Sequence, residues 1–418
     1  MIGLVDGNNF YVSCERVFDT SLEGKPVAVL SNNDGCVISR SKEFKALNIP
    51  MGTPFFELRP TVETFGLILK SSNYALYGDM SRRLMAILNE FSPEVEPYSI
   101  DEAFVDISLP AGSNYLDYAC TMRKSILRWI GIPCGIGLAK TKTLAKIANH
   151  IGKKTESGVF IMPDDASDVL DKLPVQEVWG IGRRLAEKLQ RIGVRTALQL
   201  ARKETKVLQD RFSVSVARTA LELQGIPAVK DEDSDALSQS VSCSRSFGHP
   251  VTEFQDLDEA LSFYLASSAE KLRSEKQIAA GVNVYFQLYP DYKPTPVEGG
   301  YTSTTIPFAE PTDDTSSMLH QIRPFLRGIF VEGRRYKKAG VIFFGLEPKL
   351  ARQQDLFKVI REPSSRDALY EVVDRINQQH GRGTVFTLST GIERKWSMKR
   401  EMLTPRYTTD WNELPTVN

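Results

Sequence analysis

Cysteine is scarce in this chain of 418 residues. The cysteines are odd in number, and no two of them have the C-x-x-C spacing of a zinc or redox site. They are Cys14, Cys36, Cys120, Cys134 and Cys243. A disulfide framework and a structural zinc site are therefore not expected. Free cysteines in small number are typical of proteins that work in a reducing cytoplasm.

Long hydrophobic runs and an excess of charge of one sign are also missing. No apolar run approaches the roughly 18 residues of a membrane span, and the first residues lack the pattern of a signal peptide, so we expect no membrane association. The chain has 52 basic and 52 acidic residues, a formal net charge of zero. This balance argues against a strong non-specific DNA binder acting alone, although a local basic patch can still bind nucleic acid.

Acidic side chains interrupt two apolar segments. Asp6 ends the apolar run of residues 2–5, and Asp101 and Glu102 lie side by side within the β-rich residues 95–107. Burying an unpaired carboxylate is costly or raises its pKa until it is neutral. A bound cation is the usual remedy, and Mg²⁺ binds a few carboxylates together with substrate phosphates. The pattern predicts a divalent-metal site that handles a nucleotide polyphosphate.

The two adjacent acids can share one site only if the chain bends there. In a regular strand, Asp101 and Glu102 would point to opposite faces. We therefore predict a hairpin tip at residues 99–101. An exposed hairpin with solvated acids is the alternative interpretation. For Asp106, further along the same strand, a structural or solvated role is favoured.

Residues 135–146 combine glycines with lysines after a strand. The strand is expected to end near Leu138 and a helix to begin near Thr141, where backbone N–H groups could bind an anion. The P-loop pattern G-x-x-x-x-G-K-[ST] is absent, which disfavours an ordinary NTPase. Lys142 and Lys146, one helical turn apart, could serve that anion or could form a solvated helix face. The sequence leaves both interpretations open.

A second glycine turn, Gly180-Ile181-Gly182, is expected before a helix, which a second helix ending at Gly193 would follow. Backbone N–H groups in such a turn can bind phosphates without reading bases. Arg183 and Arg184 would add to that binding through counterion release. A helix hairpin with glycine caps is the alternative, and we favour DNA binding.

Two features near the C-terminus are less specific. Residues 353–357 (QQDLF) expose leucine and phenylalanine beside charges, as in motifs that dock into a groove on a partner, but a chance helix fragment would look the same. Basic residues between 395 and 406 alternate with Trp396 and Tyr407, as in single-strand binders. We favour a packed C-terminal element for that second cluster.

The pattern changes several times along the chain. Strand and helix patterns alternate at first, with an amphipathic helix predicted over residues 77–91. Helical periodicity dominates residues 168–228, and the acidic run 230–235 is typical of a linker. Alternation returns in residues 240–347, which suggests a second split βαβ unit. Helices are expected near residues 257–274 and 316–330, and strands at 281–288 and 338–346. The tail after residue 349 is polar and broken by prolines.

Taken together, these residues resemble the Y-family, or translesion, DNA polymerases, most closely the UmuC branch that provides the catalytic subunit of bacterial DNA polymerase V. The most specific pieces are residues 98–104, 31–38 and 178–184, and the resemblance extends to the tail at residues 402–409. It covers nearly the whole chain.

The resemblance implies an α+β multidomain fold with the architecture of a right-hand polymerase. It would have a ferredoxin-like palm, small fingers, an all-α helix-hairpin thumb, a βαβ-type little finger and a polar C-terminal tail. The implied bounds are 1–21 and 77–167 for the catalytic palm, 22–76 for the fingers, 168–230 for the thumb with its helix-hairpin-helix DNA grip, 231–239 for a linker, 240–348 for the little finger and 349–418 for a C-terminal partner-binding region.

The resemblance also assigns roles to individual residues. The catalytic and metal-binding acids would be Asp6, Asp101 and Glu102, with the carbonyl of Gly7 as a backbone ligand. Tyr11 would be the steric gate that excludes ribonucleotides. The other nucleotide-binding positions would be Phe10, Ser39, Lys42, Lys45 and Lys153. The DNA-binding positions would be Gly180, Gly182, Arg183 and Arg184, and the clamp-binding positions Gln353, Leu356 and Phe357.

The implied function is error-prone translesion synthesis in the bacterial SOS response to DNA damage, by template-directed transfer of dNTPs to a primer 3′-hydroxyl with two Mg²⁺ ions. The implied partners are primed DNA, a cleaved UmuD-type dimer, a RecA filament and the sliding clamp, in the cytoplasm at the nucleoid. Two other functions fit the acids: a nucleotidyl cyclase with the same palm fold, and an inactive DNA-binding scaffold at stalled forks.

Overall fold

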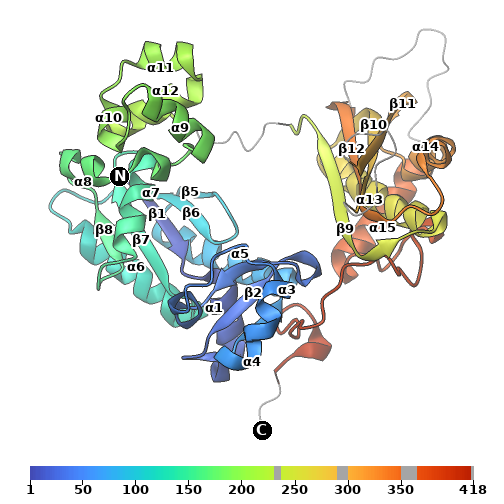
Figure 1. The fold of residues 1–418 in the computed structure, drawn as a ribbon, viewed down its shortest axis with the longest axis horizontal. Helices are drawn as coiled ribbons and strands as arrows, with labels where there is room; N and C mark the ends of the chain where they lie inside the picture. Colours follow the sequence, from blue (N-terminus) through green and yellow to red (C-terminus); the bar gives the residue numbers. More distant parts are fainter. Residues whose placement is uncertain (230–236, 290–299, 350–364, 416–418) are drawn as a thin grey trace. The chain divides into compact units, whose positions relative to one another are not determined.

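The chain folds into two compact units (Figure 1). The computed structural model describes residues 1–229, 237–289, 300–349 and 365–415. The first unit contains Met1–Ser31, Gly35–Asp233 and Met402–Asn418, and the second contains Asn32–Asp34 and Ser234–Glu401. The first unit therefore includes both ends of the chain.

A five-stranded sheet forms the centre of the first unit. Its strand order is β5 (Val95–Pro97), β6 (Glu102–Asp106), β1 (Ile2–Gly7), β7 (Cys134–Ala139) and β8 (Val159–Ile161). The central strand β1 is antiparallel to both of its neighbours, and β7 is parallel to β8. Both ends of β1 are thus fixed by two strands, which places Asp6 in a rigid position.

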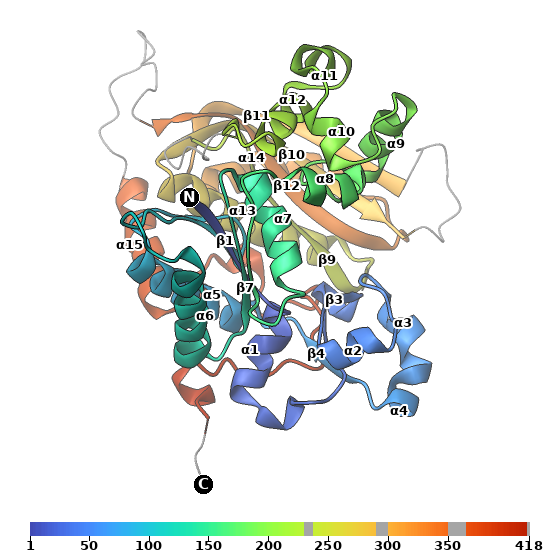
Figure 2. The same cartoon turned by 90° about the vertical axis from the view of Figure 1, so that its left-hand side faces the viewer.

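Helices cover both faces of this sheet. One face packs against α1 (Phe10–Phe18), α5 (Tyr74–Phe91) and α6 (Tyr115–Ile130), which share a core with Val5, Val105 and Ile136. In α5 the buried residues recur at helical spacing, as the sequence pattern predicted. The other face packs against α7 (Lys142–Gly152), which can be followed beside β7 in Figures 1 and 2.

Glycine lets α7 approach the sheet closely. A Cβ atom on Gly137 would lie 2.0 Å from the backbone nitrogen of Asn149 and 2.4 Å from the carbonyl oxygen of Ala145. The Asn149 side chain donates hydrogen bonds to the carbonyl oxygens of Gly135 and Leu4, at 2.8 Å and 3.3 Å. These contacts fix α7, and with it the lysines that α7 carries, relative to β1.

Two smaller parts complete the first unit. A three-stranded sheet has the order β3 (Val37–Arg40), β2 (Val27–Leu30) and β4 (Ile68–Ser71), with α2 (Lys42–Ala46), α3 (Phe55–Leu58) and α4 (Val62–Phe65) around it. A helical part contains α8 (Ser167–Lys172), α9 (Arg183–Arg191), α10 (Ala197–Ala201), α11 (Thr205–Arg211) and α12 (Val214–Leu223). The helical character predicted for residues 168–228 is confirmed.

The second unit is a doubled split βαβ arrangement. Its elements follow in the order β9 (Val241–Val251), α13 (Phe254–Ser274), β10 (Gln277–Leu288), β11 (Tyr301–Thr312), α14 (Thr315–Ile329) and β12 (Tyr336–Pro348). The sheet order is β11-β10-β12-β9, and all its pairings are antiparallel. Each helix therefore connects two parallel strands that have another strand between them, as the sequence pattern suggested.

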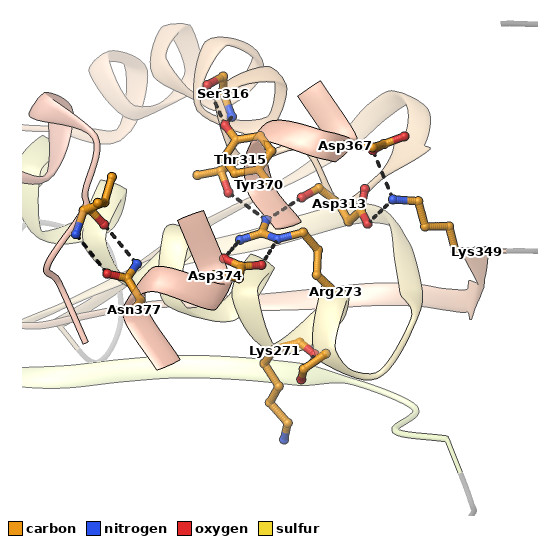
Figure 3. Close-up of polar contacts among 12 residues, drawn as sticks. Lys271, Arg273, Asp313, Thr315, Ser316, Lys349, Asp367, Tyr370, Asp374 and Asn377 are labelled. Atoms are coloured by element: carbon orange, nitrogen blue, oxygen red, sulfur yellow. Dashed lines mark hydrogen bonds and ion pairs between the residues drawn. The ribbon is translucent and has the colours of Figure 1, made fainter. Parts of the chain in front are cut away.

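The polar tail has regular structure in its described part, residues 365–415. It contains α15 (Ser365–His380), which the sequence pattern did not predict. Arg273 on α13 makes two hydrogen bonds to Asp374 of α15, at 2.6 Å and 2.9 Å, and its guanidinium lies over the ring of Tyr370 (Figure 3). Lys349 Nζ is 3.1 Å from Asp367 Oδ1.

None of the helices in the described ranges has the length and apolar composition needed to cross a membrane.

Candidate active site

Three carboxylates gather where β1 ends and β6 begins. Asp6 on β1 is the direct cross-strand partner of Glu102 on β6. Asp101 comes just before β6, and its carbonyl oxygen accepts a hydrogen bond of 2.8 Å from the backbone N–H of Gly7. The structure thus brings Asp6, Asp101 and Glu102 to one edge of the sheet, which we call the acidic edge.

The predicted hairpin tip is confirmed. Strands β5 and β6 are antiparallel, and the backbone N–H groups of Tyr98 and Ser99 both donate to the carbonyl oxygen of Glu102, at 2.9 Å and 3.1 Å. The hydroxyl of Ser99 donates to Asp101 at 2.7 Å. The tight bend ends the regular strand at Asp101, so that the two adjacent acids are not forced onto opposite faces.

Lysines compensate two of these acids. Lys153 Nζ lies 2.6 Å from Asp6 Oδ2, and Lys146 Nζ lies 3.3 Å from both carboxylate oxygens of Glu102. Lys146 lies on α7, and Lys153 is the C-cap residue of α7. The close approach of α7 to the sheet therefore places both ammonium groups beside the acids. No group of three metal-binding side chains already surrounds one point in the described parts of the chain.

Burial makes the acidic edge favourable for added positive charge. Burial raises the pKa of Asp6 to about 7, with Lys153 lowering it and the neighbouring Glu102 raising it. Burial also raises the pKa of Asp101, against the hydrogen bond from Ser99. A carboxylate with a raised pKa is under-compensated, and a nearby divalent cation would stabilise its charged form.

The donor set suits a hard divalent cation. Carboxylate and backbone carbonyl oxygens are the ligands that Mg²⁺ takes in proteins, and Mg²⁺ usually completes its shell with water and substrate phosphates. An open edge with three carboxylates therefore fits such an ion better than a closed protein cage would.

Lys142 and Lys146 do not form a solvated helix face, so that interpretation is wrong. Lys142 pairs with Glu96, and its ammonium lies 5.3 Å from the centre of the Phe104 ring. Lys146 lies 4.1 Å from the ring centre of Tyr98 and 5.3 Å from that of Trp179. Aromatic faces attract cations, so these rings hold the Lys146 ammonium beside Glu102.

The start of α7 binds a protein anion instead of a substrate anion. The backbone N–H of Thr143 donates to Glu222 Oε2 at 3.0 Å, and Glu222 is buried. The anion that the sequence pattern allowed at this helix start is therefore supplied by α12.

Basic residues of the three-stranded sheet lie near Lys153. Lys45 Nζ lies 2.5 Å from Asn9 Oδ1, and burial together with the positive charges of Arg40 and Lys153 lowers the pKa of Lys45. Ser39 is buried on β3, and Lys42 is exposed at the start of α2.

Arg40 is a candidate that the sequence reasoning missed. Its Nη1 donates to the carbonyl oxygen of Ile49 at 2.5 Å, and its buried Nε has no hydrogen-bond partner within the described residues. Lys45, Lys153 and Arg40 together suit a polyanion.

The aromatic candidates lie on α1. Phe10 is buried, and Tyr11 is partly exposed. The Tyr11 ring stacks on the ring of Tyr77, with 4.5 Å between centres and 14° between planes, and meets Tyr74 edge-on at 6.1 Å. Burial raises the pKa of Tyr11 to about 12. The sequence reasoning identified Tyr77 only as the start of a helix and did not single out Tyr74.

The second glycine turn has open space around Gly182. Gly180 has a φ of 83°, which favours glycine, and a Cβ atom on Gly182 would meet nothing within 4 Å. Arg183 and Arg184 are exposed at the start of α9. Trp179, just before the turn, donates to the hydroxyl of Tyr98 at 3.1 Å, which links the turn to the hairpin tip.

The remaining candidates lie near the C-terminus. Gln353, Leu356 and Phe357 lie outside the described residues. Trp396 is buried against Tyr264 and Phe263. Tyr407 stacks on Phe18. The interpretation of this basic and aromatic cluster as a packed element is confirmed for both aromatic side chains.

Comparison with family models finds four matches. The impB/mucB/samB family matches residues 5–150, its C-terminal domain matches 238–356, and the IMS family HHH motif matches 163–194. A domain of unknown function matches residues 367–417.

Similar proteins span the whole chain. The chain is 39% identical to the protein UmuC of Salmonella typhimurium, with 100% of both chains covered, and 40% identical to the protein ImpB of the same species, with 99% of both covered. It is 26% identical to DNA polymerase IV 1 of Bacillus subtilis, over 90% of each chain.

Solved structures show the same fold. A Y-family DNA polymerase chimera has a TM-score of 0.64 at 22% identity, covering 82% of this chain and 99% of the chimera. An insertion ternary complex of Dbh DNA polymerase has a TM-score of 0.52 at 21% identity, over 82% of this chain and 98% of that one. The predicted α+β right-hand polymerase architecture is confirmed by this likeness.

Proposed function

Because the chain belongs to the impB/mucB/samB family, in the UmuC branch of the Y-family DNA polymerases, we propose that the acidic edge is where its DNA-directed DNA polymerase reaction takes place. Translesion DNA synthesis is the function of this branch of polymerases, and divalent-metal dependence is general among them. The observation that carries the proposal is the cross-strand pairing of Asp6 with Glu102 beside Asp101, at the edge of a sheet where lysines approach Asp6 and Glu102.

We propose that the domain bounds follow the resemblance. The palm would be residues 1–21 and 77–167, the fingers 22–76, the thumb 168–230, the linker 231–239, the little finger 240–348 and the C-terminal partner-binding region 349–418. The four-stranded sheet of the second unit lies within the proposed little finger, and the helices α9 to α12 lie within the proposed thumb.

Asp6, Asp101 and Glu102, with the carbonyl of Gly7, would hold the metal. Two Mg²⁺ ions, when bound, would stabilise the entering and the leaving oxygens of an in-line displacement at the α-phosphorus. Asp6 and Asp101 would serve both ions, and Glu102 the one beside the primer 3′-hydroxyl. No side chain is needed as a nucleophile, because the primer hydroxyl attacks.

The basic residues would orient the triphosphate. Lys45 and Lys153, with Arg40, would meet the charge that develops on the pyrophosphate, which is the main protein contribution to phosphoryl transfer. Ser39, Lys42 and Phe10 complete the proposed nucleotide site. Lys153 pairs with Asp6 in the free chain, so the incoming phosphates would compete with this carboxylate for the same ammonium.

Tyr11 would select the sugar. A ring at this position can exclude a 2′-hydroxyl by steric contact. Tyr11 is partly exposed, and its ring stacks on that of Tyr77. The turn at Gly180 and Gly182, with Arg183 and Arg184, would hold the DNA backbone through N–H groups and charge.

The partners form a separate part of the proposal. A cleaved UmuD-type dimer, a RecA filament and the sliding clamp would assemble with this chain during the SOS response, in the cytoplasm at the nucleoid. The clamp would bind Gln353, Leu356 and Phe357. The support for these partners is the family of the chain and, for the clamp, the sequence of residues 353–357.

Primer extension tests the proposed site. Purified chain is incubated with primed template, Mg²⁺ and dNTPs, on intact and abasic templates. We expect extension by the wild type, and at least a roughly 1,000-fold loss in Asp101→Asn with DNA binding retained, because the metal loses a charged ligand. Asp106→Asn is the matched control, since Asp106 is exposed and pairs only with the N-terminal amine in the described structure.

Two results would contradict the proposal. Extension by Asp101→Asn at the wild-type rate would remove the metal assignment. A wild-type chain that binds primed DNA but extends nothing, with its proposed partners supplied, would favour the inactive scaffold.

A further inference from the structure

The C-terminal residues 402–409 are built into the first unit. The backbone N–H of Ser71, at the end of β4, donates to the carbonyl oxygen of Met402 at 2.9 Å, and the N–H of Met402 donates to the Ser71 hydroxyl at 2.9 Å. The side chain of Asn73, the N-cap of α5, donates to the carbonyl oxygens of Thr404 and Pro405 at 3.1 Å and 3.0 Å. These pairs fix the segment to the elements that enter α5.

Thr404 reaches a buried carboxylate on α1. Glu15 is only 1% exposed, and its Oε1 accepts hydrogen bonds from the hydroxyl of Tyr77 at 2.6 Å and from the hydroxyl of Thr404 at 3.2 Å. A buried carboxylate depends on its donors, because losing one leaves acceptor capacity unsatisfied in a site that water does not reach. The C-terminal segment therefore helps to decide where the Glu15 carboxylate lies.

Tyr77 passes this constraint to the surface of the proposed nucleotide site. The Tyr77 ring is fully buried, and its hydroxyl donates a hydrogen bond to Glu15. The ring of Tyr11 stacks on it. Stacked rings restrain one another, because separating or tilting one of them loses contact area. Hydrogen bonds therefore connect Thr404 to Glu15 and Glu15 to Tyr77, and stacking connects Tyr77 to Tyr11.

We propose that residues 402–409 position the Tyr11 ring, with Thr404 acting through Glu15 and Tyr77, and so contribute to selection against ribonucleotides. The inference rests on the proposed function, in which Tyr11 contacts the sugar. It gives a role in sugar selection to part of the segment matched by the domain of unknown function. Thr404 and Glu15 touch no substrate, so they are positioning residues.

The test compares sugar selection among variants of the full chain. The ratio of kcat/KM for a dNTP to that for the matching rNTP is measured by primer extension. Thr404→Val keeps the shape of the side chain but removes its hydroxyl, so we expect the ratio to fall by about three- to tenfold. Thr404→Ser restores a hydroxyl and should restore most of the ratio.

Thr409→Val is the control for hydroxyl loss in the same segment, because the Thr409 hydroxyl bonds only the carbonyl of Arg406 in the described structure. It should leave the ratio unchanged. If Thr404→Val does not fold, as judged by thermal unfolding, Tyr77→Phe replaces it. That variant keeps the ring under Tyr11 and removes the hydroxyl that Glu15 holds.

Tyr11→Ala separates the two possible failures. If it leaves the ratio unchanged, Tyr11 is not the gate, and the proposed function loses that assignment together with this inference. If Tyr11→Ala collapses the ratio while Thr404→Val and Tyr77→Phe match the wild type, this inference alone is overturned.

The double variant gives a readout that a merely structural role would not produce. In Tyr11→Ala, the ring to be positioned is missing, so adding Thr404→Val should lower the ratio no further. A further fall of the same size as in the wild-type background would overturn the inference.

Discussion

At the scale of single residues, the acids were predictable and their lysine partners were not. Asp6, Asp101 and Glu102 stood out because charges interrupt segments that are otherwise apolar. The pairing of Glu102 with Lys146 depends on which face of α7 meets the sheet, which local sequence does not state. Lys146 and Lys153 are seven residues apart, which places them on one side of a helix, and that spacing was the available signal.

Lys153 gives a prediction about nucleotide binding. Replacing it in Lys153→Met removes a cation that is placed to bond phosphate oxygens, so we expect the KM for dNTP to rise by at least about tenfold. Steady-state primer extension over a range of dNTP concentrations measures it. Lys154→Met is the matched control, because Lys154 is exposed and next in sequence. An unchanged KM in Lys153→Met would remove this lysine from the triphosphate site.

At the scale of elements, the helices with a clear pattern of buried residues were predictable. The helices α5 and α7 lie close to where the sequence placed them. The hairpin tip was predicted from its two adjacent acids instead, since its residues 99–101 are only partly buried. The strands β9 and β11 were missed. Both are edge strands of the second sheet, and polar residues such as Ser, Thr and Arg occupy much of their length. An edge strand has only one neighbouring strand, so it needs fewer apolar residues than a central strand does.

The helix α15 was also missed, although for a different reason. Polar contacts attach much of it to the second unit, above all the Arg273–Asp374 pair and the Tyr370 hydroxyl that bonds Ser316 (Figure 3). The sequence nevertheless carries a helical signal, since Leu369, Val372, Val373 and Ile376 recur at i, i+3, i+4 and i+7. The proline-broken, polar composition of the tail led the sequence reasoning to pass over this spacing.

The approach of α7 to β7 gives a prediction at this scale. In Gly137→Ala, the new methyl group would overlap the backbone of Asn149 and Ala145, so we expect the free energy of unfolding to fall by about 2 kcal/mol or more. Urea unfolding measures it.

Gly182→Ala is the comparison variant for Gly137→Ala, since its φ of −74° suits alanine and nothing lies within 4 Å of the added carbon. We expect it to unfold within about 0.5 kcal/mol of the wild type. Equal stability of the two variants would contradict the close approach of α7.

At the scale of the whole molecule, the family resemblance predicted more of the architecture than any local sequence pattern did. The contacts of Thr404 with Asn73 join residues 331 positions apart, which no periodicity could reveal. The same holds for the division into two units, because the last residues of the chain belong to the first unit. Composition did set one property of the whole, its formal net charge of zero.

A balanced charge predicts weak and moderately salt-dependent DNA binding by the chain alone. Each neutralised phosphate contributes about −0.9 to the slope of log affinity against log salt. We expect Arg183→Ala with Arg184→Ala to flatten this slope by about 1 to 2, measured by fluorescence anisotropy with primed DNA. Removing two exposed charges of α6, in Lys124→Ala with Arg128→Ala, is the control and should leave the slope unchanged. If the α6 variant flattened the slope and the Arg183 and Arg184 variant did not, the assignment of DNA binding to the Gly180 turn would be wrong.

The central claim is that the acidic edge binds the metal at the reacting centre. Crystals of the chain with primed template, a non-hydrolysable dNTP and Mn²⁺ in place of Mg²⁺ would locate the ions directly by anomalous scattering. We expect peaks at roughly 2.1 Å from carboxylate oxygens of Asp6, Asp101 and Glu102, between the primer end and the α-phosphate. Anomalous peaks bound to other side chains, with these three carboxylates still held by Lys153, Lys146 and Ser99, would contradict it.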